Sequence, residues 1–306
     1  MKLLYTLALL TIVFLSSCDN KYEPKSSDDV ETINSGKLTI YVDESIESVI
    51  DSTFSMYEKD YPNVELTVNY ADSRNIMAQL LGAKTRVAVN SRDYLDDELE
   101  QMKKFEVKNH KRFPIAYDAL VYFVNKDFPI DTLNANDIEN AISNGSSLSD
   151  NTENLNFEPT YATLDQNSSI FANFSKYMNY QDTLRKKVEL FGDMEQLKKQ
   201  VESNNSIIGV AYLSHLINDD RFKMIELGFT VDSTKEFIRP KPVHQGYIVQ
   251  DLYPYKVTYW GYLLEDRQDL PFWFVTYLAK QTIAQQHFLN EGIVPAFAQI
   301  KLKYEE

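Results

Sequence analysis

The chain has 306 residues, and its 45 acidic side chains outnumber the 31 basic ones, giving a formal charge of −14. This balance argues against nucleic acid or anionic lipid as the partner, because the overall field repels phosphate backbones. It does not exclude a small anion in a closed cleft, where nearby donors outweigh distant, screened charges. The single cysteine excludes an intrachain disulfide, so the fold depends on its hydrophobic core.

Residues 1–18 have the pattern of a bacterial lipoprotein signal peptide. Lys2 precedes an apolar run over residues 3–15, and small residues then lead to Cys18. We expect cleavage before Cys18 and lipidation of its thiol, so that the membrane is contacted through the lipid anchor only. A signal anchor and an ordinary secretory signal are the alternatives, but the run is short against the roughly 20 residues of a spanning helix.

Residues 19–35 are polar and almost free of aliphatic side chains, so we expect a flexible tether between the anchor and the folded part. The protein is then expected in the cell envelope, facing the periplasm or the exterior. Asp19, directly after Cys18, is an inner-membrane retention signal in some bacteria but not in all. The choice of membrane therefore stays open.

The next part of the chain alternates between apolar runs and helical patterns. Three strand and helix pairs are predicted, at 37–42 with 46–61, 64–70 with 76–81, and 86–89 with 96–104. This order indicates a parallel sheet with helices on its faces, which makes the fold class α/β.

The β-α pattern restarts in the second half of the chain. Strands are predicted at 115–125, 160–163, 207–212 and 257–264, helices at 169–177, 188–203 and 270–289, and an exposed loop at 144–158. In the last helix we expect one buried face, made of Phe272, Val275, Thr276, Ala279 and Ile283, with a structural role.

Common enzyme signatures are absent from the sequence. It has no nucleophile elbow, no zinc-protease motif, no P-loop and no dinucleotide fingerprint. The four histidines are scattered without ligand spacing, so we expect no metal site and no cofactor. We expect no enzymatic activity, because no nucleophile and base can be paired.

Polar residues gather where predicted strands lead into helices. They are Asp43, Glu44 and Ser45; Asp72 and Ser73; Ser91 and Arg92; and Gln166, Asn167, Ser168 and Ser169. In an open α/β sheet, ligands bind outside the carboxyl ends of the strands, and serine and arginine there suit a small oxyanion. Each group taken singly could instead be an ordinary helix N-cap.

With these loops, much of the chain resembles the phosphate-type (PstS-like) substrate-binding proteins of ABC transporters, especially the lipoprotein branch common in Bacteroidetes. The matching segments are YVDESIESVIDSTFSMYEKDYPNVELTVNY, LLGAKTRVAVNSRDYLDDE, IAYDALVYFVNKDFPIDTL, IIGVAYLSHL and FVTYLAKQTIAQQHFLNEGIVPAF. The resemblance implies a type 2 periplasmic-binding-protein fold, with two α/β lobes, a two-strand hinge and a ligand in the interlobe cleft. It also implies inorganic phosphate or another small oxyanion and ABC permease subunits as partners. We expect a monomer.

The resemblance also assigns the loops. Residues 43–45 match the first ligand loop, Ser73 the second, Ser91 and Arg92 the third, and 166–169 the loop of the second lobe. The glycines common in the family's first two loops are absent, and Ser169 and Ile170 stand where Gly-Thr is common. A sensor or adhesion lipoprotein that keeps the fold is therefore the alternative function.

Phosphate keeps a proton at neutral pH, so a carboxylate that accepts a hydrogen bond from this P–O–H group would favour phosphate over sulfate. We expect Asp43 to be this acceptor, with Asp72 and Asp118 as rivals. Arg92 is predicted to hold the anion or to lock the loops that do so. The alternative for Arg92 is an ion pair with the acidic run Asp93, Asp96, Asp97 and Glu98.

The order of the elements predicts two lobes. Lobe I combines residues 36–122 with 241–306, and lobe II spans 123–240, because the final strand and helix have no partner in the second half. Such a chain crosses between the lobes twice, which places the cleft at the hinge.

Overall fold

The computed structural model describes residues 31–180, 188–231 and 233–297. The predicted signal peptide, its Cys18 and most of the predicted tether lie outside these residues. Within them, none of the helices is both long enough and apolar enough to cross a membrane.

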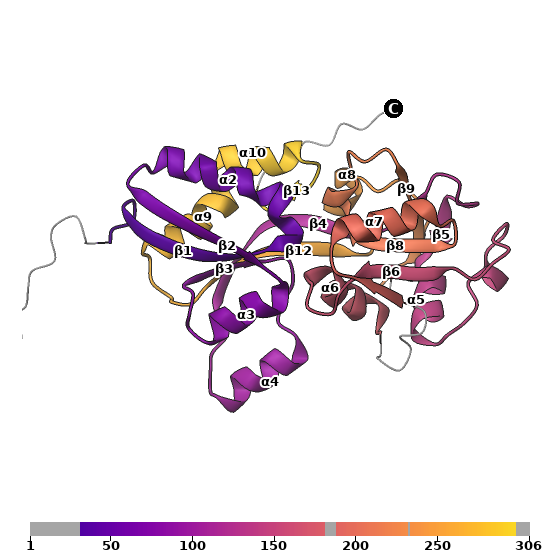
Figure 1. Ribbon diagram of the computed structural model, residues 1–306, viewed down its shortest axis with the longest axis horizontal. Coiled ribbons are helices and arrows are strands. Elements are labelled where there is room, and N and C mark those ends of the chain that lie inside the picture. Colours follow the sequence, from indigo (N-terminus) through magenta and orange to yellow (C-terminus); the bar gives the residue numbers. More distant parts are fainter. Residues whose placement is uncertain (1–30, 181–187, 232, 298–306) are drawn as a thin grey trace, which may run out of the picture. The chain divides into compact units, whose positions relative to one another are not determined.

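The first strand group is a parallel sheet. Strand β1 (Gly36–Asp43) lies between β2 (Val64–Ala71) and β3 (Val87–Asn90) and pairs with both. Helix α2 (Glu47–Asp60) packs on one side, and α3 (Ser73–Leu81) packs on the other against β1 and β3, as Figure 1 shows. Helix α4 (Asp96–Lys104) follows β3. The β-α order predicted for this part is confirmed.

Strand β4 (Lys111–Asn125) joins the first strand group to the second. Up to Ala119 it pairs antiparallel with β12 (Lys256–Leu263), which also pairs with β3. From Leu120 onward its partners are instead β8 (Ile207–Tyr212) and β9 (Phe222–Met224). Within the described residues, ten strands thus form one continuous hydrogen-bonded sheet that passes through β4.

In the second strand group, β6 (Thr160–Leu164) lies between β8 and β7 (Val188–Phe191) and pairs in parallel with both. Helices α6 (Ser169–Met178) and α7 (Met194–Ser203) pack against these strands. A separate small sheet of β5 (Thr132–Asn134), β10 (Glu226–Thr230) and β11 (Phe237–Ile238), with helix α5 (Ala135–Ser143), completes this part. Strand β13 (Val294–Pro295) instead pairs with β4 at Ala116 and Tyr117, and helix α8 (Gln245–Val249) contacts β4 and β13.

The helix predicted at 188–203 is wrong in its first part. Residues 188–191 pair with β6 as strand β7, and the helix begins only at Met194. Asp193 caps that helix by accepting a hydrogen bond from the backbone N–H of Gln196 at 2.8 Å. The Gly192-Asp193 pair is the local signal that a strand ends and a helix begins there.

The long C-terminal helix is two helices, α9 (Leu270–Lys280) and α10 (Thr282–Asn290). Gln281 between them has extended backbone angles. The buried Gln285 stabilises this break, because its Nε2 donates to the carbonyl of Leu278 at 2.7 Å. The predicted buried face is wrong at Ile283, which is 49% exposed.

The mixed α/β class is confirmed. The predicted lobe boundaries stay a prediction, since β4 belongs to both strand groups. The change of partners within β4 falls between Ala119 and Leu120, a few residues before the predicted boundary after residue 122.

Candidate functional site

Asp43 ends β1 and is fully buried. Its Oδ1 accepts a hydrogen bond from the backbone N–H of Ser45 at 3.0 Å. Its Oδ2 accepts from the backbone N–H of Ser91 at 3.2 Å and from the Ser91 hydroxyl at 2.5 Å. The carboxylate thus joins the ends of the neighbouring strands β1 and β3.

Ser91 also meets three side chains of the second strand group. Its Oγ lies 2.7 Å from Ser169 Oγ and 3.0 Å from the Tyr212 hydroxyl. Asn173 Nδ2 donates to the Ser91 carbonyl at 2.9 Å and to the Tyr212 hydroxyl at 2.8 Å. We call Asp43, Ser91, Ser169, Asn173 and Tyr212 the Ser91 cluster.

The fold explains why these residues meet. Asp43 ends β1, Ser91 follows β3, and Tyr212 ends β8, so each lies at the carboxyl end of a strand. Ser169 and Asn173 are four residues apart on α6 and therefore lie on one face of that helix. The cluster occupies the edge of the sheet at which α/β proteins bind ligands.

Ser45 adds a buried hydroxyl to the first loop. The residue is 5% exposed, and its Oγ has no hydrogen-bond partner among the residues that the structure describes. An unpaired buried hydroxyl costs about 1–3 kcal/mol, so a donor or acceptor at this position would find a ready partner.

His215 lies next to Tyr212, with the two rings stacked 6.0 Å apart. Burial, followed by the charge of Lys198, lowers the pKa of His215 to about 4. The histidine is therefore neutral at physiological pH and adds no positive charge beside the Ser91 cluster.

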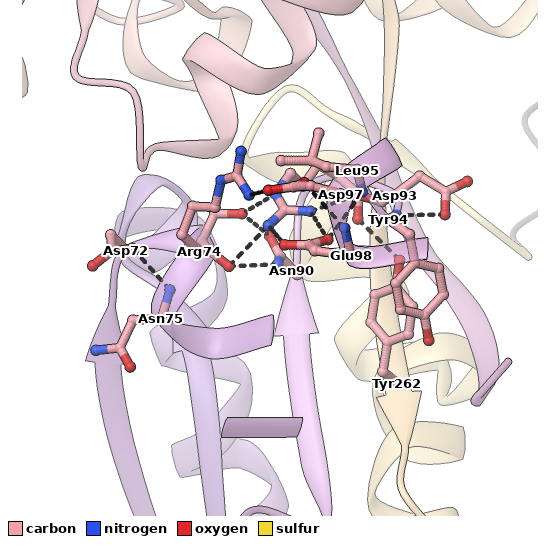
Figure 2. Close-up of polar contacts among 12 residues, drawn as sticks. Asp72, Arg74, Asn75, Asn90, Asp93, Tyr94, Leu95, Asp97, Glu98 and Tyr262 are labelled. Atoms are coloured by element: carbon pink, nitrogen blue, oxygen red, sulfur yellow. Dashed lines mark hydrogen bonds and ion pairs between the residues drawn. The ribbon is translucent and has the colours of Figure 1, made fainter. Parts of the chain in front are cut away.

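Arg92 is engaged within the first strand group. Its guanidinium donates to both carboxylate oxygens of Glu98, at 2.6 and 2.8 Å, and to the hydroxyl of Ser73. The pair is almost completely buried, with side chains 2% and 8% exposed. Figure 2 shows Glu98 of this pair close to Asn90. This geometry matches two of the roles predicted for Arg92: holding the ligand loops in place, and forming an ion pair with the acidic run.

The predicted residues of the second loop lie beside this pair rather than in the Ser91 cluster. Ser73 Oγ donates to Asn90 Oδ1 at 3.0 Å. Asp72 caps α3 by accepting from the backbone N–H of Asn75 at 2.8 Å. The structure thus gives Asp72 an N-cap role, which was the alternative for each loop.

Glu44 is exposed and faces a pocket of about 530 Å³ that is also lined by Glu47, Asp51 and His215. The pKa of Glu44 is raised by the partial burial of its carboxyl group and then by four nearby carboxylates, those of Asp43, Asp72, Asp165 and Glu47. The surroundings of this side of the cluster are therefore acidic.

Asp118 is fully buried but belongs to another group. Its Oδ2 accepts from the Tyr259 hydroxyl at 2.5 Å, which links β4 to β12. Burial raises the pKa of Asp118, although hydrogen bonds from Tyr259 and Ser214 oppose the shift. The contacts of Asp118 link the strands that pair antiparallel at the centre of the sheet.

The residues of the predicted loop 166–169 have different roles in the structure. Ser169 joins the Ser91 cluster, whereas Ser168 caps α6 by accepting from the backbone N–H of Phe171 at 3.1 Å. Gln166 and Asn167 are exposed, and the Asn167 carbonyl accepts from the backbone N–H of Arg74 at 3.1 Å.

Sequence reasoning missed Asn173 and Tyr212. Tyr212 ends the predicted strand 207–212, and Asn173 lies one helical turn after the predicted Ser169. Both positions could have been found, since Tyr212 is a strand end and Asn173 shares a helix face with the predicted Ser169.

Comparison with known proteins places the chain among binding proteins. A family model described as a PBP superfamily domain matches residues 29–282. No curated protein matches the sequence.

Solved structures share the fold at low sequence identity. An ABC-type phosphate transport receptor from Vibrio cholerae is 15% identical, with a TM-score of 0.67 over 85% of this chain and 100% of that one. A Clostridium perfringens protein, assigned as a phosphate ABC transporter substrate-binding protein and crystallised with phosphate, is 14% identical, with a TM-score of 0.67 over 85% and 99%.

A substrate-binding domain assigned to a molybdenum ABC transporter of Clostridium difficile is 18% identical. Its TM-score is 0.51 over 84% of this chain and 98% of that one. At these identities the comparison shows the fold, which this chain shares with substrate-binding proteins of ABC transporters.

Proposed function

This chain belongs to the PBP superfamily, and on that premise we propose that it binds phosphate or a similar small oxyanion in the Ser91 cluster and delivers it to an ABC permease. We further propose that it is a lipoprotein, with Cys18 as the lipidated residue. We propose that the two lobes are those predicted from the sequence, residues 36–122 with 241–306 and residues 123–240, and that the Ser91 cluster lies between them.

The observation that carries the proposal is the buried Asp43 carboxylate, which accepts hydrogen bonds from Ser45 and Ser91. Ser91 in turn contacts Ser169, Asn173 and Tyr212 of the second strand group. A carboxylate can accept a hydrogen bond from a protonated oxyanion, whereas it repels a fully ionised one. The remaining hydrogen bonds to the anion would come from donors in the same network: the Ser45 backbone N–H, the hydroxyls of Ser91 and Ser169, and the Asn173 amide.

Binding of the anion would replace hydrogen bonds within the Ser91 cluster by hydrogen bonds to the anion. Ser91 Oγ and Ser169 Oγ lie 2.7 Å apart, too close for an anion between them, so the strand groups must separate before binding. Each hydroxyl then donates to a ligand oxygen in place of its present partner. Glu98 holds the guanidinium of Arg92, so we assign Arg92 to positioning the loop of Ser91.

Calorimetry on the purified protein, titrated with phosphate and sulfate, tests this function. We expect phosphate to bind and sulfate to bind at least tenfold more weakly. Asp43→Asn should lower the affinity for phosphate at least tenfold, because the amide no longer offers two acceptor oxygens. Asp72→Asn is the matched control, since asparagine can still cap α3 and the affinity should stay unchanged.

Two outcomes would contradict the proposal. If no anion binds, the chain keeps the fold for another role, as in the sensor or adhesion alternative. If Asp43→Asn and Asp72→Asn change the affinity for phosphate equally, the acceptor lies elsewhere.

The lipid anchor is tested separately. Replacing Cys18 by alanine removes the thiol that would be acylated, so we expect the protein to move from the membrane fraction to the soluble fraction of expressing cells. Membrane association that is unchanged by Cys18→Ala would contradict lipidation at this residue.

A further inference from the structure

A pocket of about 760 Å³ lies between α4 and α6, next to the Ser91 cluster. Tyr94, in its lining, follows Ser91 in the chain by three residues. Helix α6 supplies Ser169 and Asn173 to the cluster and Ala172 and Lys176 to the pocket. Both strand groups therefore line the pocket, and the side chains that line it are not those of the Ser91 cluster.

Its size suits an organic molecule. Ligand pockets for small organic molecules span about 300–1,000 Å³, far more than a tetrahedral oxyanion occupies. The rings of Tyr94 and Phe171 and the side chain of Leu99 line it, and Leu99 is 41% exposed. A ligand with a carbon skeleton could bury this apolar surface.

Its charge is locally positive in an acidic protein. Arg74, Arg112 and Lys176 line it against Asp93 and Asp96. His110 adds no charge at neutral pH, because burial lowers its pKa. The lining thus carries one net positive charge, whereas the whole chain carries −14.

Two of the three cations already have partners. The Arg112 guanidinium donates to both carboxylate oxygens of Asp93 and stacks 4.2 Å from the Trp260 ring. Arg74 donates to Asp97, a contact that Figure 2 shows at the start of α4. Lys176 has no hydrogen-bond or ion-pair partner among the residues that the structure describes.

Lys176 nevertheless acts across the pocket. It lies on α6, and its charge contributes to lowering the pKa of Asp93 on the first strand group, after the larger effects of the Arg112 and Tyr94 contacts and against burial. An ammonium that reaches into a pocket without a fixed carboxylate is available to a ligand anion.

Amides complete the lining. Gln166 and Asn179, on either side of α6, are exposed and offer both donors and acceptors. Hydroxyl groups of a sugar pair with such amides, its carbon face packs on aromatic rings, and a phosphate substituent pairs with a lysine.

We propose that this pocket is a second ligand site, which binds a sugar phosphate with Lys176 paired to the phosphate and the sugar against Tyr94 and Phe171. The site is separate from the Ser91 cluster, so its ligand does not require Asp43. Because both strand groups line it, an occupied pocket would favour their closed arrangement.

Calorimetry with glucose 6-phosphate on the purified full-length protein tests this site. We expect binding that Lys176→Ala weakens at least tenfold and that Lys176→Arg largely retains. Lys199→Ala, an exposed lysine on α7 outside the pocket, should change nothing. Glucose, which lacks the phosphate, should not bind at the same concentrations.

The two sites are distinguished by crossed variants. Asp43→Asn should leave glucose 6-phosphate binding intact, and Lys176→Ala should leave inorganic phosphate binding intact. Loss of glucose 6-phosphate binding in Asp43→Asn, with no effect of Lys176→Ala, would show that the ester uses the Ser91 cluster and would overturn the second site. Absence of glucose 6-phosphate binding to the unaltered protein would overturn it as well, whatever phosphate does.

Discussion

At the scale of single residues, the Ser91 cluster is held by hydrogen bonds and offers no unpaired cation to an anion. Arg92, the one arginine next to Ser91, is neutralised by Glu98, whose Oε2 also accepts from the backbone N–H of Leu95 at 2.9 Å. Asp43 is surrounded by N–H and O–H donors instead of cations. Recognition of an anion there would depend on hydrogen bonds, which discriminate by protonation and geometry more than by charge.

The buried pair predicts a large stability effect. Arg92→Ala should lower the free energy of unfolding by about 3 kcal/mol or more, because Glu98 would remain buried without its cation. Chemical denaturation of the variant and of Arg92→Ala combined with Glu98→Gln measures this. The double variant should recover part of the loss, because the charge left unpaired is removed.

Arg267 provides the control for Arg92. Its ion pairs with Glu265 and Asp269 involve a side chain that is 67% exposed, so Arg267→Ala should destabilise the protein far less than Arg92→Ala. Equal losses in the Arg92 and Arg267 variants would mean that burial does not set the strength of the Arg92 pair.

The sequence indicated three of the five cluster residues, Asp43, Ser91 and Ser169, because strand ends and helix starts carry local signals. It indicated a pairing of Arg92 with the acidic run that contains Glu98 as an alternative to an anion-binding role. It could not single out Glu98, since that depends on how α4 folds back. It also missed Tyr212 and Asn173, whose partner Ser91 is 121 and 82 residues away. Each of the two positions carries a local signal, a strand end for Tyr212 and a helix face for Asn173, but their pairing with Ser91 over such separations leaves no trace in the local pattern.

At the scale of elements, helices α2 and α9 pack against each other in the first strand group, whose strands β1 and β3 lead to Asp43 and Ser91 of the cluster. On α9, the Phe274 ring lies 5.9 Å from Phe54 and 4.9 Å from Tyr57 of α2. The periodicity predicted a buried helix face in this region, but the predicted set included the exposed Ile283 and left out the buried Phe274. A helix this apolar has no clear polar side from which the buried side could be told. The break at Gln281 depends on the tertiary contacts of Gln285 and so could not be read from periodicity.

This packing predicts a contrast between adjacent aromatic residues. Phe274→Ala should lower the free energy of unfolding by roughly 3–5 kcal/mol, because it leaves a cavity among buried rings. Trp273→Ala, at a side chain that is 41% exposed, should cost about 1 kcal/mol or less. Denaturant unfolding of both variants measures the difference, and similar losses would contradict the assignment of the buried face.

At the scale of the whole chain, β4 changes its strand partners between Ala119 and Leu120, so one strand serves both strand groups. The Ser91 cluster bridges the same two groups through side chains. Ligand binding at the cluster would therefore be coupled to the relative position of the groups, as in hinge closure around a bound solute. The α/β class was predictable from the alternation of strands and helices, whereas these contacts between distant segments were not.

A crystal structure determined at saturating phosphate tests the central claim most directly. We predict a tetrahedral anion bonded to Asp43, Ser91 and Ser169, with Ser91 Oγ and Ser169 Oγ farther apart than their present 2.7 Å. A cluster that keeps this 2.7 Å contact at saturating phosphate, with the anion elsewhere or not bound, would contradict the proposed oxyanion site.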